Sequence, residues 1–192
     1  MNAKLWSIPA NVPIKLFFAI RPDDAAAAAM ETLSARLRRA HRLRGCPIAR
    51  PRLHNTLALV HDTGALRDNI ARAKAIGDRL WRRSFSVCFD WTGSFRGGGS
   101  GHPLVLRGGE GLAPLSDFRG ALRDEMLRAG FGVAHSFTPH VTLMWADRCV
   151  EDYPILPIAW TVRDFVLTAS VQGYCCHIEV ARWPLQETEP SA

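Results

Sequence analysis

The four-residue pattern His-x-Thr-Leu occurs twice in this chain, as His54-Asn55-Thr56-Leu57 and as His140-Val141-Thr142-Leu143. Each copy lies in a stretch that is typical of a β-strand, where successive side chains alternate between the two faces. The histidine and the threonine of each copy therefore point the same way. Two such strands side by side would present two imidazoles and two hydroxyls to one cleft, a set suited to moving protons on both sides of a bound phosphate.

Hydrophobic periodicity predicts the element order β-α-β-α-β-β-α-β-β-β. The predicted strands span 14–20, 54–61, 85–91, 104–106, 140–145, 160–169 and 174–183, and the helices about 24–40, 64–82 and 112–129. Asp23 or Asp24 is a suitable N-cap for the first helix. The glycine-rich stretch 97–101 is typical of a turn, and the proline-rich region 154–157 of a surface connection.

Both motif strands follow a helix by a loop, so we expect a duplicated, bilobal α+β fold. Two antiparallel-rich sheets would face a central cleft, with helices on the outside. We expect residues 1–13 to be a loose N-terminal leader, residues 14–185 a single bilobal domain, and residues 186–192 a C-terminal tail.

Composition places the chain among globular proteins, with 192 residues, 47% hydrophobic content and a net charge of +6. Lys4, Lys15 and Lys74 are the only lysines, so the positive charge is mostly arginine, which suits an anionic substrate. A GC-rich genome would produce the same bias. Five cysteines without CxxC spacing indicate reduced thiols, and no stretch is typical of a signal peptide or transmembrane span. We expect a cytoplasmic monomer, because the cleft is complete within one chain.

Segments beyond the two motifs carry a family resemblance. Residues 16–22, 137–143 (with a proline before His140) and 181–183 are similar to the opening strand, second motif and closing strand of the 2H phosphoesterase superfamily. Within it, the chain resembles the RNA 2′,3′-cyclic phosphodiesterases, historically called 2′-5′ RNA ligases. The resemblance covers about residues 14–185.

The resemblance implies that 2′,3′-cyclic phosphates, at RNA ends or in small cyclic nucleotides, are hydrolysed to 2′-phosphates, with 2′-5′ ligation as the reverse reaction. It implies His54 as general acid for the leaving 3′ oxygen and His140 as general base for water, although the two roles can be exchanged. Thr56 and Thr142 would bind the non-bridging phosphate oxygens. No metal or cofactor is then required.

Three positions depart from the family pattern. Trp145 stands where many relatives have an arginine, Asn55 where the residue is usually apolar, and His177 where relatives often have a tyrosine. Trp145 would instead stack on a base, as aromatic residues do with unpaired RNA. His177 and Phe18 are further candidate substrate contacts. The candidate replacements for the arginine, among which the sequence does not choose, are Arg50, Arg52, Arg96 and Arg148.

Alternative functions remain open at this point. On the same fold, the substrate would be ADP-ribose 1″,2″-cyclic phosphate or a 2′-5′ oligonucleotide. A non-catalytic protein that binds RNA ends or nucleotides is a second alternative. A metallohydrolase using His54, His140 and His177 ranks last, because the motifs contain no carboxylate ligand and no HExxH-like spacing.

Overall fold

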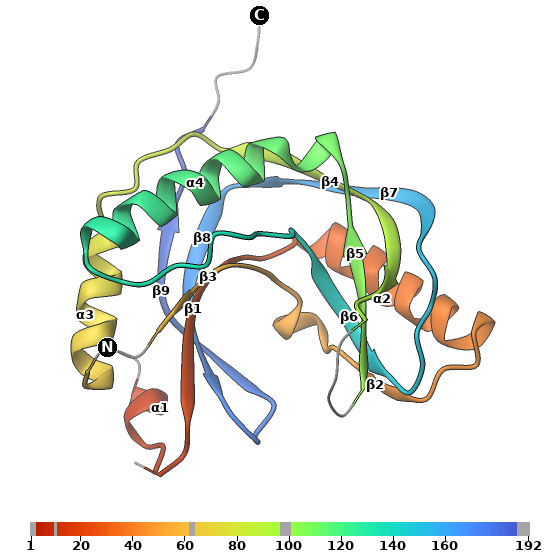
Figure 1. Ribbon diagram of the computed structural model, residues 1–192, viewed down its shortest axis with the longest axis horizontal. Coiled ribbons are helices and arrows are strands. Elements are labelled where there is room, and N and C mark those ends of the chain that lie inside the picture. Colours follow the sequence, from red (N-terminus) through yellow and green to blue (C-terminus); the bar gives the residue numbers. More distant parts are fainter. Residues whose placement is uncertain (1–2, 10, 62–63, 97–100, 188–192) are drawn as a thin grey trace, which may run out of the picture.

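The computed structural model describes residues 3–9, 11–61, 64–96 and 101–187, which form two antiparallel sheets (Figure 1). The four-stranded sheet has the order β3-β1-β8-β9, with β1 at Ile14–Ile20, β3 at Asn55–Val60, β8 at Asp164–Val171 and β9 at Cys176–Pro184. The five-stranded sheet has the order β2-β6-β5-β4-β7, with β2 at Gly45–Pro47, β4 at Phe85–Ser94, β5 at His102–Arg107, β6 at Val141–Ala146 and β7 at Tyr153–Val162. The predicted α+β class with two antiparallel sheets is confirmed.

The longer helices flank the pair of sheets on opposite sides (Figure 1). Helix α2 (Asp24–Ala40) packs on β6 and β7, whereas α3 (Leu66–Gly77) and α4 (Ala113–Arg128) pack on each other and contact β9, β3 and β4. Three single-turn elements complete the set: α1 (Ala3–Trp6), η1 (Arg50–Arg52) and η2 (Glu110–Leu112). The predicted N-cap of α2 is confirmed, because the Asp23 carboxylate accepts the Ala26 N–H at 2.8 Å.

Strand alternation in β1 separates two apolar clusters. Phe18 and its even-numbered neighbours belong to the main core, which continues through both sheets to the helices. Phe17 and Ala19 point the other way and form a small cluster with Val166. The second cluster lies on the face of the four-stranded sheet that carries the first motif.

Neither sheet is a contiguous half of the chain. Strand β2 follows α2 and joins the sheet of the second motif, while β8 and β9 return from the C-terminal part to the sheet of the first. The two lobes are therefore tied together by crossing segments, and one main core serves both.

Two predictions about local structure are wrong. The region 154–157 is not a connection but part of β7, and its prolines are tolerated because β7 is an edge strand. The N-terminal segment is not a loose leader, since Leu5 is only 3% exposed and the Arg67 guanidinium lies 4.4 Å from the Trp6 ring centroid.

Most of the predicted glycine turn, at 97–100, and part of the predicted C-terminal tail, at 188–192, lie outside the described residues. None of the described helices has the length and apolar character needed to cross a membrane.

Candidate active site

Each motif histidine lies just before a strand, His54 before β3 and His140 before β6. In each ring, Nδ1 lies close to the carbonyl oxygen two residues earlier, at 2.6 Å for His54 and Arg52 and at 2.8 Å for His140 and Thr138. A carbonyl oxygen only accepts hydrogen bonds, so Nδ1 carries a proton in both rings. Nε2 is therefore the nitrogen that is free to take up or release a proton.

Both motifs contain a β-bulge at their leucine. The register between β1 and β3 shifts so that Leu57 has no partner, and the register between β5 and β6 shifts in the same way at Leu143. A bulge changes which residues share a face of the sheet. In the first motif it places Leu59, which is 45% exposed, on the same face as Thr56.

The second bulge brings Trp145 onto the face of the second motif. Thr142 pairs with Val105, and Trp145 pairs with Pro103. Val105 and Pro103 are two residues apart and share a face, so Thr142 and Trp145 share it too. Trp145 is 52% exposed there, about 7 Å along the sheet from Thr142, because their partners are two residues apart at roughly 3.3 Å per residue.

Asn55 connects the two motifs directly. Its Nδ2 donates a hydrogen bond of 2.9 Å to the His140 carbonyl oxygen, although the side chain is fully buried. Its Oδ1 has no hydrogen-bond partner among the described residues. The residue that departs from the apolar family pattern thus holds the start of β6 against the start of β3.

The environment of His54 favours its neutral form. Burial lowers the pKa of His54, the hydrogen bond to the Arg52 carbonyl opposes this, and the charges of Arg21, His140 and Arg52 lower it further. The influence of His140 shows that the two motif histidines are close enough to interact electrostatically.

His177 lies against the first motif. Its ring centroid is 5.2 Å from that of His54 in an edge-on arrangement, and 5.5 Å from that of Phe17. Burial, together with the charges of His54, Arg52 and Arg21, lowers the pKa of His177 to about 4. At neutral pH, His177 is an uncharged ring that supports His54.

A cavity of about 380 Å³ runs between the two motifs. Thr56 of the first motif and His140 of the second both line it, and the Phe95 ring packs edge-on against His140 at 4.8 Å. Arg119, which is 7% exposed and donates to the Ala134 carbonyl, forms part of the wall. His54 is set deeper, against Phe17 and His177, and does not line the cavity.

Of the four arginines that sequence analysis considered as replacements, three bind carboxylates. Arg50 pairs with Glu31, Arg96 with Glu151 and Arg148 with Asp147. Arg52 has no carboxylate partner within the described part of the chain, and its Nε is buried without a hydrogen-bond partner. Its charge also acts on both His54 and His177, so it is the candidate cation beside the first motif.

The prediction that Phe18 contacts substrate is wrong. Phe18 is 0% exposed and packs against Phe165 and Trp183 on the core face of the sheet. Phe17 is the aromatic residue that contacts His54, with ring centroids 5.0 Å apart. Phe17 does not stand out in the sequence, because the strand pattern alone does not fix which face of β1 the motif shares.

Residues suited to metal binding form no cluster in the described segments: no group of three or more His, Cys, Asp and Glu side chains has the geometry to hold an ion. The polar groups of the cleft are instead imidazoles, hydroxyls and guanidinium groups. This set can transfer protons and bind an anion.

Comparison with known proteins gives matches among solved structures. No protein-family model matches the sequence, and no curated protein matches it significantly. E. coli LigT in its apo form is 24% identical, with 92% of this chain and 99% of that chain covered and a TM-score of 0.70. A protein described as a phosphoesterase is 24% identical (91% and 99% covered, TM-score 0.68), and TT0787 of Thermus thermophilus is 22% identical (90% and 98% covered, TM-score 0.69).

The chain has the fold of E. coli LigT and of the protein described as a phosphoesterase. The predicted resemblance to the 2H phosphoesterase superfamily is thereby confirmed at the level of the fold. The similarity extends over nearly the whole LigT chain. E. coli LigT itself has been crystallised with 3′-AMP, ATP, NADP⁺ and phosphate.

Proposed function

We propose that this LigT-like protein is a metal-independent phosphodiesterase that opens 2′,3′-cyclic phosphates, at RNA ends or in small cyclic nucleotides, to 2′-phosphates. The observation that carries the proposal is the paired geometry of His54 and His140, each fixed through Nδ1 by its own upstream carbonyl. The nucleotide complexes of E. coli LigT support a nucleotide as substrate.

In the proposed reaction, His140 Nε2 takes a proton from water as the water oxygen attacks phosphorus. The bond from phosphorus to the ribose 3′ oxygen breaks, and His54 Nε2 gives that oxygen a proton. Thr56 and Thr142 bind the non-bridging oxygens, whose charge grows in the transition state. The product is a 2′-phosphate, and solvent restores both protonation states.

The acid role of His54 requires a substrate-linked change in its protonation. In the empty cleft, burial lowers the pKa of His54 and keeps the ring neutral. A phosphate anion next to the ring favours the imidazolium and raises the pKa again. We therefore propose that the substrate itself brings His54 to its acidic form.

Arg52 supplies the positive charge that the family arginine would supply at Trp145. It is half-buried, lacks a carboxylate partner in the described chain, and acts electrostatically on His54. Arginine forms forked hydrogen bonds to phosphate oxygens. Trp145, exposed on the face of Thr142, is then free to stack on a base of the substrate.

The decisive experiment incubates the protein with EDTA and nucleoside 2′,3′-cyclic monophosphates or a short RNA ending in a cyclic phosphate. Phosphorus NMR identifies the product isomer, and His54→Ala and His140→Ala are assayed alongside. We expect a 2′-phosphate that disappears in both variants. Activity that survives in both variants would contradict the mechanism, and nucleotide binding without turnover would favour the non-catalytic alternative.

An aryl phosphodiester, bis(p-nitrophenyl) phosphate, separates the two histidine roles. Its leaving group departs without protonation, so loss of the general acid matters little for this substrate. We expect His54→Ala to retain much more activity on the aryl ester than on the cyclic phosphate, and His140→Ala to lose both. The reverse pattern would exchange the two roles.

A further inference from the structure

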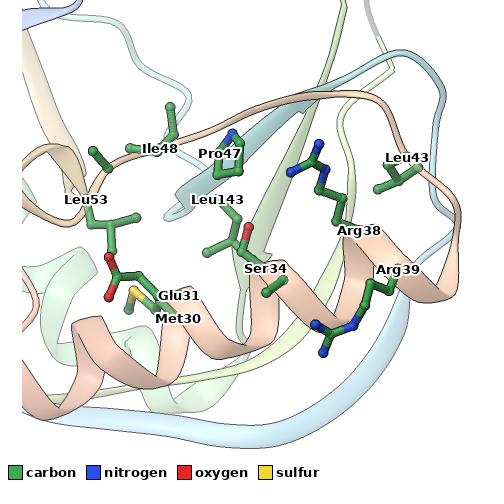
Figure 2. A pocket seen from close by; sticks show the side chains of 12 residues that line it. Met30, Glu31, Ser34, Arg38, Arg39, Leu43, Pro47, Ile48, Leu53 and Leu143 are labelled. Carbon is green, nitrogen blue, oxygen red and sulfur yellow. The ribbon is translucent and has the colours of Figure 1, made fainter.

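A second cavity, of about 500 Å³, lies between α2 and the segment that leads from β2 to the first motif (Figure 2). This volume is within the range of small-molecule sites, roughly 300–1,000 Å³. Its apolar walls come from several elements of the fold: Met30, Leu43, Pro47, Ile48, Leu53 and Leu143. The cavity is separate from the one that Thr56 and His140 line.

Ser34 provides an unsatisfied polar group in this apolar wall. Its side chain belongs to α2 and is shown among the residues around the cavity in Figure 2. Ser34 is only 5% exposed, and its Oγ has no hydrogen-bond partner among the described residues. A serine on a helix commonly bonds the carbonyl four residues earlier, and leaving a buried hydroxyl unpaired costs about 1–3 kcal/mol. The Oγ is inaccessible from the cavity as it stands, so a ligand oxygen would remove that cost once the hydroxyl turned toward it.

Charge at the two ends of the cavity is unequal. Glu31, at the end near Leu53, is neutralised by Arg50, whose Nε lies 2.9 Å from the Glu31 carboxylate. Arg38 and Arg39 line the other end and have no carboxylate partner in the described segments. The cavity thus combines an apolar body with a positively charged end, which complements a molecule with an apolar chain and an anionic head.

We propose that this cavity binds a small amphipathic carboxylate, independently of the reaction in the cleft. The apolar chain would lie against Met30, Leu53 and Leu143, and the carboxylate would accept hydrogen bonds at the arginine end. The Ser34 hydroxyl would donate to the bound molecule as well. The site shares no lining residue with the cavity between the two motifs, so this proposal is independent of the proposed function.

Methyl NMR with octanoate as the probe tests the site on the full chain. With ¹³C-methyl methionine labelling, Met30 reports on the cavity, while Met126, fully buried on α4, is an internal control. We expect a saturable shift of the Met30 signal and no shift of the Met126 signal. Absence of a saturable Met30 shift at millimolar octanoate would overturn the proposal.

Head-group recognition is tested with octan-1-ol and with charge variants of α2. We expect octan-1-ol, and octanoate with Arg38→Gln/Arg39→Gln, to bind at least about tenfold more weakly than octanoate with the unaltered chain. Arg36→Gln removes one charge from the same helix, against two in the double variant, at a position that does not line the cavity, and we expect it to change nothing. Equal affinity for alcohol and carboxylate, or equal effects of the two sets of variants, would show an apolar cavity without anion recognition and refute the proposal.

Discussion

Arg52→Gln tests whether Arg52 supplies the phosphate-binding charge that the sequence lacks at Trp145. The substitution keeps the backbone carbonyl that holds His54 Nδ1, so the ring orientation is preserved. Losing a hydrogen bond to a charged group costs about 1.5–3 kcal/mol. At about 1.36 kcal/mol per factor of ten, kcat/KM on a cyclic nucleotide should fall roughly 10- to 150-fold.

The loss should include kcat, because the phosphate gains negative charge as water attacks, so the guanidinium binds the transition state more strongly than the ground state. Removing the Arg52 charge also raises the pKa of His54, since this charge is one of those that, besides burial, lower it. The falling limb of the pH profile of kcat/KM should therefore move to higher pH in Arg52→Gln. Arg52→Lys keeps the charge but not the forked geometry. In this variant kcat/KM should fall at the same pH as in the unaltered protein, and part of the activity should remain.

Arg50→Gln is the matched control for this experiment. Arg50 lies in the same short helix, η1, but is exposed and paired with Glu31. Its substitution should change kcat/KM less than twofold. Equal effects of the two substitutions, or an Arg52→Gln variant with unaltered kinetics, would refute the assignment of Arg52 to the phosphate.

Three further predictions concern the rest of the cleft. Because burial lowers the pKa of His54 in the free protein and substrate raises it, kcat/KM should decline with rising pH earlier than kcat does; coincident profiles would contradict the acid role. Asn55→Ala removes the hydrogen bond to the His140 carbonyl. It should lower the free energy of unfolding by about 1–3 kcal/mol in urea titrations, with a parallel fall in kcat. An unchanged kcat would show that this hydrogen bond does not position His140. Trp145→Ala should raise KM for a short RNA severalfold more than for a mononucleotide if the indole stacks on a second base, and an equal effect on both would exclude that role.

The parts of the fold that sequence analysis predicted are those with strong local signals. The alanine-rich α2 with its Asp23 cap and the alternating strand β4 follow from periodicity alone. The strands that it missed, β2 and the first part of β7, are the two edges of the five-stranded sheet. Edge strands tolerate proline and glycine, so β2 and β7 contain the residues that normally indicate a turn.

The candidate site shows the same division. The His-x-Thr-Leu repeat identified the motif residues, because the histidine and threonine of each copy lie within four consecutive positions. The choice of Arg52 among the four candidate arginines, the contact of Phe17 and the bulges were not predictable, because each depends on a partner from another strand or on the absence of one. The ion pairs and burial of the folded chain distinguish Arg52 from Arg50, two residues away in the same turn.

Different contacts determine the orientation of each motif imidazole and the placement of the two imidazoles relative to one another. Orientation is local in both copies, since Nδ1 bonds a carbonyl only two residues upstream and needs no other element. Placement is tertiary, and the Asn55 amide on the His140 carbonyl is the direct bond that joins one motif to the other. A variant at Asn55 should therefore leave each ring in its orientation but allow the distance between the two imidazoles to vary. Proton transfer on the two sides of one phosphate, as proposed for this site, depends on that distance. The bond from Asn55 to His140 would therefore offset the cost of burying the Asn55 Oδ1 without a hydrogen-bond partner.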